Sequence, residues 1–120
     1  MAKDYREITK SISASLAKYR VSQPEVMKGF GALSAAALRE GALSEKTKEL
    51  IALCVGVAGH CDACIGFHVR TLVKLGVTRP ELEEALAVAV YMGGGPSLMY
   101  AAEALSAFEQ FSVTAELAPA

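Results

Sequence analysis

Two cysteines and a histidine stand at a spacing that could support thiol redox chemistry. Cys61 and Cys64 form a Cys-x-x-Cys pair, and His68 follows four residues after the second cysteine. If residues 61–68 are helical, the three side chains share one face, because successive residues of an α-helix turn by about 100°. The two cysteine Cα atoms would then be about 5 Å apart, within the range for a disulfide. The pattern predicts a redox dithiol with a proton carrier beside it.

A break in an apolar run places this pair at the beginning of a helix. Residues 50–58 are almost continuously apolar, Gly59 interrupts them, and an amphipathic pattern resumes after Asp62. We therefore expect two helices that meet at Gly59 and His60, with Cys61 at or near the start of the second. The unpaired N–H groups and partial positive charge of a helix start favour a thiolate there. His60 lies off the face of the pair and is expected to be an exposed hinge residue.

Other uses of the cysteines are compatible with the spacing. The pair and His68 could supply three zinc ligands, with a fourth from Glu49, Cys54 or His60. Against zinc, three ligands along one helix converge poorly on one ion, and the sequence lacks the second Cys-x-x-Cys or histidine pair that closes most structural zinc sites. A thioredoxin-like domain would need strands around the motif, and the chain has few strand signals. Cys54, deep in the apolar run, is expected to be a buried small hydrophobe.

Length and composition indicate one small domain that assembles with copies of itself. The chain has 120 residues, and 52% of them are hydrophobic although it has no tryptophan. The core must therefore be aliphatic and rich in alanine, and so much apolar surface is hard to hide in a small monomer. We expect a homo-oligomer.

Charge and cysteine usage exclude several classes of function. The net charge is −1, and the lysines and arginines form no basic stripe in the sequence, so we expect no nucleic-acid partner. The beginning of the chain, MAKDYREITK, is charged rather than apolar, and the longest apolar run is too short to cross a bilayer. These features predict a cytoplasmic protein without a membrane partner, and cysteines in such a chain indicate reactive or metal-bound thiols rather than a disulfide scaffold.

Helical periodicity and capping signals extend over nearly the whole chain and predict an all-α bundle of five or six helices. Ser22 is expected to cap the second helix and Ser44 the third, while Thr78 and Glu81 form a capping box. The expected helices are 4–20, 24–39, 45–58, 61–74, 79–92 and 96–111, followed by a loose tail at 112–120.

The fifth expected helix has an apolar stretch that suggests deep burial. Residues 85–92 are apolar nearly all round, which is typical of the most buried helix of a bundle. Tyr91 in this stretch and Tyr100 in the next helix are expected in the core or at an interface between subunits.

Glu49 stands where the polar residues 45–48 give way to the apolar run. Its spacing alone predicts a solvated carboxylate on the surface of a helix. A carboxylate paired with His68 requires the third helix to fold back on the fourth at Gly59 and His60, which periodicity does not show.

The complete spacing of these residues resembles the signature of the AhpD-like proteins of the carboxymuconolactone decarboxylase superfamily. The signature here consists of Glu49, eleven residues, the Cys-x-x-Cys pair, three residues and His68. The segment after it, Leu75-Gly76-Val77-Thr78 with Glu81 and Glu84, is also similar to that family. The resemblance covers about residues 25–110. It implies a single all-α domain over residues 1–120, with its motif-bearing core at about 25–111, and assembly into a trimer or hexamer.

The resemblance also implies an activity, the reduction of organic hydroperoxides or disulfides without a metal or organic cofactor. Cys64 would attack the peroxide and become a sulfenic acid, and Cys61 would donate a proton and then form the Cys61–Cys64 disulfide. Glu49 and His68 would form the proton relay that activates Cys64. A lipoyl-type dithiol or a thioredoxin-like protein would then supply electrons.

Two departures from the family pattern bear on this expectation. The best-characterised hydroperoxidase of the family is longer and has a histidine between its cysteines, where this chain has Asp62 and Ala63. A carboxylate beside a thiol disfavours the thiolate, which would slow attack on a peroxide. Two alternatives therefore stay open: a non-catalytic helical oligomer that binds a metal or ligand, and a lyase like the decarboxylases. The decarboxylase branch works without this dithiol.

Overall fold

The computed structural model describes residues 2–117, and this part of the chain contains six α-helices and no strand. The helices are α1 (Tyr5–Ser22), α2 (Pro24–Leu38), α3 (Glu45–Ala58), α4 (Asp62–Lys74), α5 (Arg79–Gly93) and α6 (Gly95–Leu117). The all-α prediction is confirmed. None of these helices is both long enough and apolar enough to cross a membrane.

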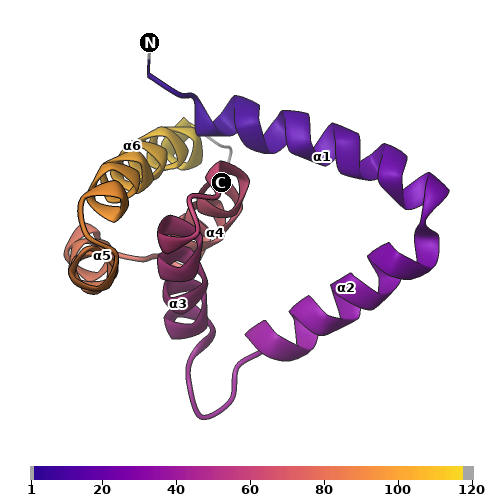
Figure 1. Ribbon diagram of the computed structural model, residues 1–120, viewed down its shortest axis with the longest axis horizontal. Helices are drawn as coiled ribbons and strands as arrows, with labels where there is room; N and C mark the ends of the chain where they lie inside the picture. Colours follow the sequence, from indigo (N-terminus) through magenta and orange to yellow (C-terminus); the bar gives the residue numbers. More distant parts are fainter. Residues whose placement is uncertain (1, 118–120) are drawn as a thin grey trace.

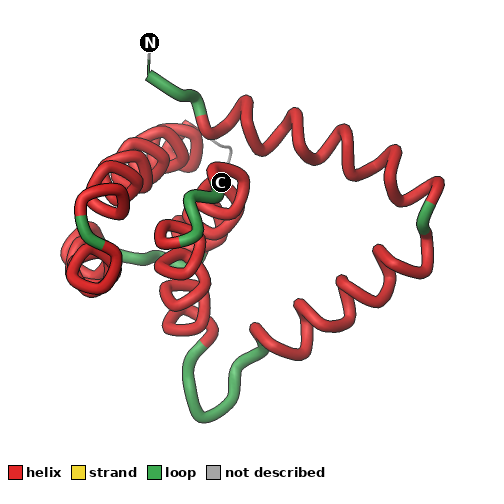
Figure 2. Tube along the Cα trace, in the orientation of Figure 1, coloured by secondary structure: helices red, strands yellow, loops and turns green. Residues whose placement is uncertain are grey.

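Helices α3 to α6 form the body of the molecule, and α1 and α2 extend from it as a V-shaped arm (Figures 1 and 2). The core lies where α4 packs against α3 and α6, with α5 closing the far side. It is aliphatic and alanine-rich, as the composition predicted. Its fully buried members include Leu53, Val57, Ile65, Val69, Leu72, Leu82, Ala104 and Ala107.

The first turns of α1 hold the arm to the body. Tyr5 and Thr9 are buried against α4 at Gly66, where a Cβ atom would lie only 2.6 Å from the Thr9 methyl group. A side chain at position 66 would therefore push α1 away from α4. Beyond this contact α1 is exposed, and α2 has no buried residue.

Capping residues explain most of the helix boundaries. The Ser44 hydroxyl accepts a hydrogen bond from the backbone N–H of Thr47, and Thr78 and Glu81 form the predicted capping box at the start of α5. The predicted cap Ser22 is wrong, because Ser22 is the last residue of α1 and its hydroxyl donates to the Tyr19 carbonyl. Pro24 begins α2 without a side-chain cap.

Two expectations about the last helices are also wrong. Helix α5 is not the most buried helix: only one side of it packs on the core, while Val88, Tyr91 and Met92 are exposed, Tyr91 by 84%. Tyr91 is therefore not a core residue of the single chain, and its place at an interface stays a prediction. Helix α6 continues past Phe111 to Leu117, so residues 112–117 are helical rather than a loose tail, and residues 118–120 lie outside the described part.

The capping box makes a testable contribution to stability that depends on pH. A hydrogen bond from Lys46, together with the Thr78 backbone N–H, lowers the pKa of Glu81 to about 2. Because the pKa is depressed in the folded state, this contribution is complete above the unfolded pKa of about 4.3 and is lost as the pH falls towards 2. We expect Glu81→Gln to unfold at lower urea concentration than the wild type at pH 7, with the difference disappearing near pH 2. If the two proteins differed equally in urea midpoint at both pH values, the charge of Glu81 would not be the source of the stability.

Candidate active site

A tight turn between α3 and α4 brings the residues of the predicted site together. The backbone N–H of Gly59 donates to the Val55 carbonyl at 2.8 Å, and the N–H of Cys61 donates to the Gly56 carbonyl at 3.0 Å. Between them His60 has a φ of 54°, in the left-handed region that a residue with a side chain seldom adopts. The chain thus reverses within three residues, and α4 lies back along α3.

A glycine on α3 allows the start of α4 to approach closely. A Cβ atom at Gly56 would lie 3.0 Å from the Cβ atom of Cys64, which is tighter than ordinary packing permits. A larger residue at position 56 would displace the Cys-x-x-Cys segment from α3. The close approach sets the start of α4 against the C-terminal half of α3, and His68, further along α4, then lies opposite Glu49.

The two cysteines occupy the start of α4, as the sequence predicted. Cys61 is the N-cap residue, and Cys61 and Cys64 form a disulfide in this structure, with their Cα atoms 5.2 Å apart. The backbone N–H of Cys64 donates to the Sγ atom of Cys61 at 3.1 Å. Both residues are partly exposed, so the pair is accessible to a small molecule or to another thiol.

Glu49 is buried and paired with His68, and the surface position predicted from its spacing is wrong. Its carboxylate lies 2.6 Å from Nδ1 of His68, and the residue is only 4% exposed. The spacing misled because α4 covers the side of α3 that carries Glu49. Since a carboxylate can only accept, Nδ1 carries the proton and Nε2 is left as the ring atom able to take another. His68 is one helical turn beyond Cys64, so their Cβ atoms are about 5–6 Å apart.

Asp62, between the two cysteines, is held by residues at the beginning of the chain. Both of its carboxylate oxygens lie 3.1 Å from Nζ of Lys3, and the hydroxyl of Tyr5 donates to it at 3.0 Å. Burial and the bond to Asp62 raise the pKa of Tyr5, so the phenol stays protonated and acts as the donor. The charge of Asp62 is thus partly neutralised next to the thiols. The sequence held no signal for this contact, because Lys3 and Asp62 are 59 residues apart.

We expect the Lys3–Asp62 pair to set the reactivity of the reduced thiols. In Asp62→Asn the negative charge beside the helix start is removed, so thiolate is favoured and alkylation by iodoacetamide at pH 7 should accelerate. Lys3→Met should slow it, because an unpaired carboxylate disfavours the thiolate. Both changes should be below about tenfold, since the ion pair is partly exposed. Changes in the same direction for both variants would contradict this account.

Cys54 and His60, the other residues considered for the site, do not take part in the cysteine pair. Cys54 is half-buried, its Sγ atom donates to the Ala85 carbonyl at 3.3 Å, and burial raises its pKa, so it remains a thiol. His60 is exposed, as predicted, and its ring stacks on that of Tyr100 with centroids 4.7 Å apart. Within residues 2–117 no three His, Cys, Asp or Glu side chains are arranged so that they could hold a metal ion.

The fold and this site together define a class of proteins. A helical bundle that presents a Cys-x-x-Cys pair at a helix start, beside a buried Glu–His pair, has the features of the AhpD-like proteins. A model of the carboxymuconolactone decarboxylase family matches residues 24–107. The chain belongs to that family, whose superfamily includes the AhpD-like proteins.

Solved structures and curated sequences are similar over most of the chain. A carboxymuconolactone decarboxylase family protein from Legionella pneumophila is 62% identical with a TM-score of 0.89, over 90% of this chain and 96% of that one. A Thermotoga maritima protein is 27% identical with a TM-score of 0.81, over 93% and 99%. An uncharacterised protein of Cupriavidus necator is 41% identical over 88 residues, 73% of this chain and 78% of that one. An uncharacterised protein of the cox locus of Paracoccus denitrificans is 33% identical over 98 residues, 82% and 88% respectively.

Proposed function

We propose that the chain is a thiol oxidoreductase that reduces organic hydroperoxides through a Cys61–Cys64 dithiol–disulfide couple. The observation that carries the proposal is the buried Glu49–His68 pair, one helical turn from a partly exposed cysteine pair that forms a disulfide. A purely structural cysteine pair would need no proton acceptor beside it. Membership of a superfamily that contains the AhpD-like proteins supports the same activity.

In the first step Cys64 gives up its proton to Nε2 of His68 and its thiolate attacks the terminal oxygen of the hydroperoxide. The O–O bond breaks, Cys64 becomes a sulfenic acid, and the leaving alkoxide takes the proton of the Cys61 thiol to give the alcohol. Glu49 keeps Nδ1 protonated and stabilises the imidazolium that forms between these transfers.

In the second step the Cys61 thiolate attacks the Sγ atom of the Cys64 sulfenic acid. The S–O bond breaks, the leaving hydroxide takes the proton held by His68 and becomes water, and the disulfide seen in the structure is formed. Two electrons and two protons from an external dithiol return the pair to its reduced state. A lipoyl-type dithiol or a thioredoxin-like protein has the required chemistry.

A disulfide substrate is the second candidate for the same cysteines. It is favoured by the position of Cys61 at the N-cap, where the helix start stabilises a thiolate and the residue is partly exposed. In that reaction Cys61 would attack the substrate disulfide, and Cys64 would resolve the mixed disulfide. No peroxide would be consumed.

We also propose that the working form is a homo-oligomer, a trimer or hexamer. The support is the arm, since α2 buries no side chain and exposes Val26, Phe30 and Leu33, by 52%, 66% and 63%. Large apolar side chains spaced along one face of a helix and exposed to water are typical of a surface that another subunit covers. Light scattering coupled to size-exclusion chromatography measures the subunit number directly.

A thiol count tests the proposed reaction. The reduced protein has three thiols per chain, and we expect one equivalent of cumene hydroperoxide to leave one, as measured after denaturation. A dithiol reductant should restore all three. Three unchanged thiols would overturn the peroxidase proposal, and a mixed-disulfide assay with a small aromatic disulfide would then test the second candidate.

A further inference from the structure

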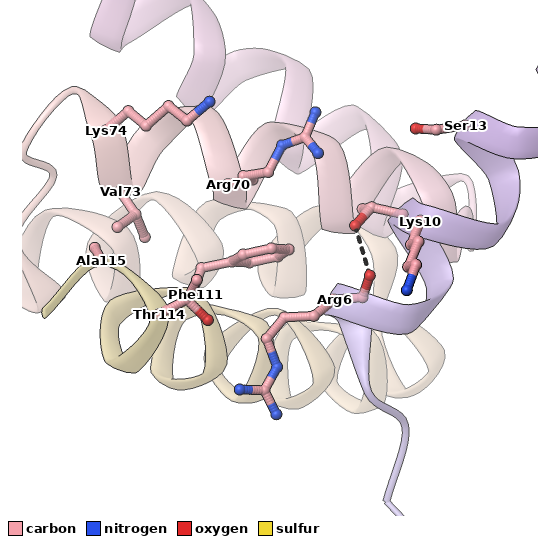
Figure 3. A pocket seen from close by; sticks show the side chains of 10 residues that line it. Arg6, Lys10, Ser13, Arg70, Val73, Lys74, Phe111, Thr114 and Ala115 are labelled. Carbon is pink, nitrogen blue, oxygen red and sulfur yellow. Dashed lines mark hydrogen bonds between the residues drawn. The ribbon is translucent and has the colours of Figure 1, made fainter. Parts of the chain in front are cut away.

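A cavity of about 670 Å³ lies between α1, α4 and α6, away from the cysteines (Figure 3). At about 100° per residue, its α4 residues, Arg70, Val73 and Lys74, lie on roughly the opposite side of that helix from Cys61, Cys64 and His68. The cavity is therefore a separate feature of the fold, and the proposed redox reaction makes no use of it. Its volume is within the range of small-molecule sites.

Positively charged side chains surround this cavity. Arg6 and Lys10 approach it from α1 and Arg70 and Lys74 from α4, while none of its lining residues is acidic. The whole chain has a net charge of −1, so this gathering of cations is a local feature rather than a consequence of composition.

Most of this charge is not neutralised within the described part of the chain. Arg6 pairs with the neighbouring Asp4 at 3.1 Å. Lys10, Arg70 and Lys74 form no ion pair with any carboxylate of residues 2–117. The guanidinium of Arg70 instead lies over the ring of Phe67, with 5.0 Å between its central carbon and the ring centroid. Three cations are thus available to a ligand.

The floor of the cavity is apolar. Val73 from α4 and Phe111 and Ala115 from α6 line it, and the ring of Phe111 lies between the two helices in Figure 3. The hydroxyls of Thr9 and Thr114, which also line it, already donate to backbone carbonyls of their own helices. The floor therefore offers contact area but little hydrogen bonding.

We propose that this cavity binds a single-chain amphiphile, with an anionic head group at the basic rim and an alkyl chain on the apolar floor. A small inorganic anion would leave the floor in contact with water. A neutral alkyl compound would leave the cations without a partner. A carboxylate and a phosphate monoester on an alkyl chain both have the required chemistry, because both accept hydrogen bonds from arginine and lysine.

Titration calorimetry with four probes tests the proposal: laurate, dodecyl phosphate, dodecanol and inorganic phosphate. The two anionic amphiphiles are kept below the concentration at which they form micelles, and dodecanol within its solubility. The protein is used as the Cys61–Cys64 disulfide, so the result is independent of the proposed redox reaction. We expect laurate or dodecyl phosphate to bind at one site per chain, and at least tenfold more tightly than dodecanol or phosphate. Whichever of these two anions binds more tightly shows whether the site prefers a carboxylate or a phosphate head group.

Two matched double variants separate this site from general binding to apolar surface. Arg70→Gln with Lys74→Gln removes two cations of the rim, and Lys18→Gln with Lys28→Gln removes two exposed cations of the arm. We expect the first to weaken binding of the tighter amphiphile at least tenfold and the second to leave it within twofold, while circular dichroism confirms that both are folded. Any of three results would overturn the proposal: an affinity in the first variant equal to that of the wild type, dodecanol binding as tightly as the anions, or no binding of either anion.

Discussion

Cys64→Ser is expected to lower the rate of hydroperoxide reduction by at least about 10³-fold, because a serine hydroxyl does not supply the thiolate that attacks the peroxide. The rate is measured by consumption of cumene hydroperoxide with an excess of a dithiol reductant. The substitution is nearly isosteric, and Cys64 is partly exposed, so the fold should be unaffected.

Cys61→Ser separates the two cysteine roles. Here we expect one rapid turnover that stops at a Cys64 sulfenic acid, which dimedone labels and mass spectrometry locates. The opposite assignment, in which Cys61 attacks the peroxide, also has a physical basis, because Cys61 is at the N-cap and its Sγ atom accepts a hydrogen bond from the N–H of Cys64. His68 favours Cys64 because it stands one turn beyond it and can take its proton. Dimedone labelling of Cys61 in Cys64→Ser, at the wild-type rate, would reverse the roles.

Cys54→Ser is the matched control for both variants. The Cys54 thiol is half-buried, with a raised pKa, and is hydrogen-bonded to the Ala85 carbonyl, which a serine hydroxyl can also reach. We expect its rate to be within about twofold of the wild type. A large loss in this variant would mean that a third thiol takes part in the reaction.

The helices and the cysteine pair could be predicted because their signals are local. The Cys-x-x-Cys spacing, the break at Gly59 and the capping box at Thr78 each act within a few residues, and the structure has all three features. The spacing also placed the cysteine Cα atoms at about 5 Å, and they are 5.2 Å apart.

Features that depend on how the helices pack against one another could not be predicted from local sequence signals. The burial of Glu49 depends on the reversal at His60, and periodicity alone therefore indicated a surface position. Helix α5 has an apolar composition all round, but only one side of it finds a partner within the chain, and Tyr91 is left exposed. The contact of Lys3 with Asp62 joins distant segments of the chain and has no counterpart in a local pattern.

Glu49→Gln is expected to lower the peroxidase rate by about 10²-fold or more, within the range for loss of acid–base catalysis. The amide can still accept from Nδ1 of His68, so the ring stays oriented, but it has no charge to stabilise the imidazolium. Glu45→Gln, on the exposed first turn of the same helix, is the matched control and should keep the full rate.

A positioning role for Glu49 can be told apart from a structural one by a double-mutant cycle. If Glu49 acts only through His68, the variant carrying both Glu49→Gln and His68→Gln should be no slower than His68→Gln alone, since the relay is already lost. The rate of thiol alkylation as a function of pH gives a second readout. The pH at the midpoint of this curve should shift in Glu49→Gln and remain unchanged in Glu45→Gln. A purely structural role would give three other results: the rate losses of the two single variants would multiply in the double variant, the melting temperatures would fall, and the pH profile would not shift. The buried pair would then stabilise the fold and take no part in moving the proton.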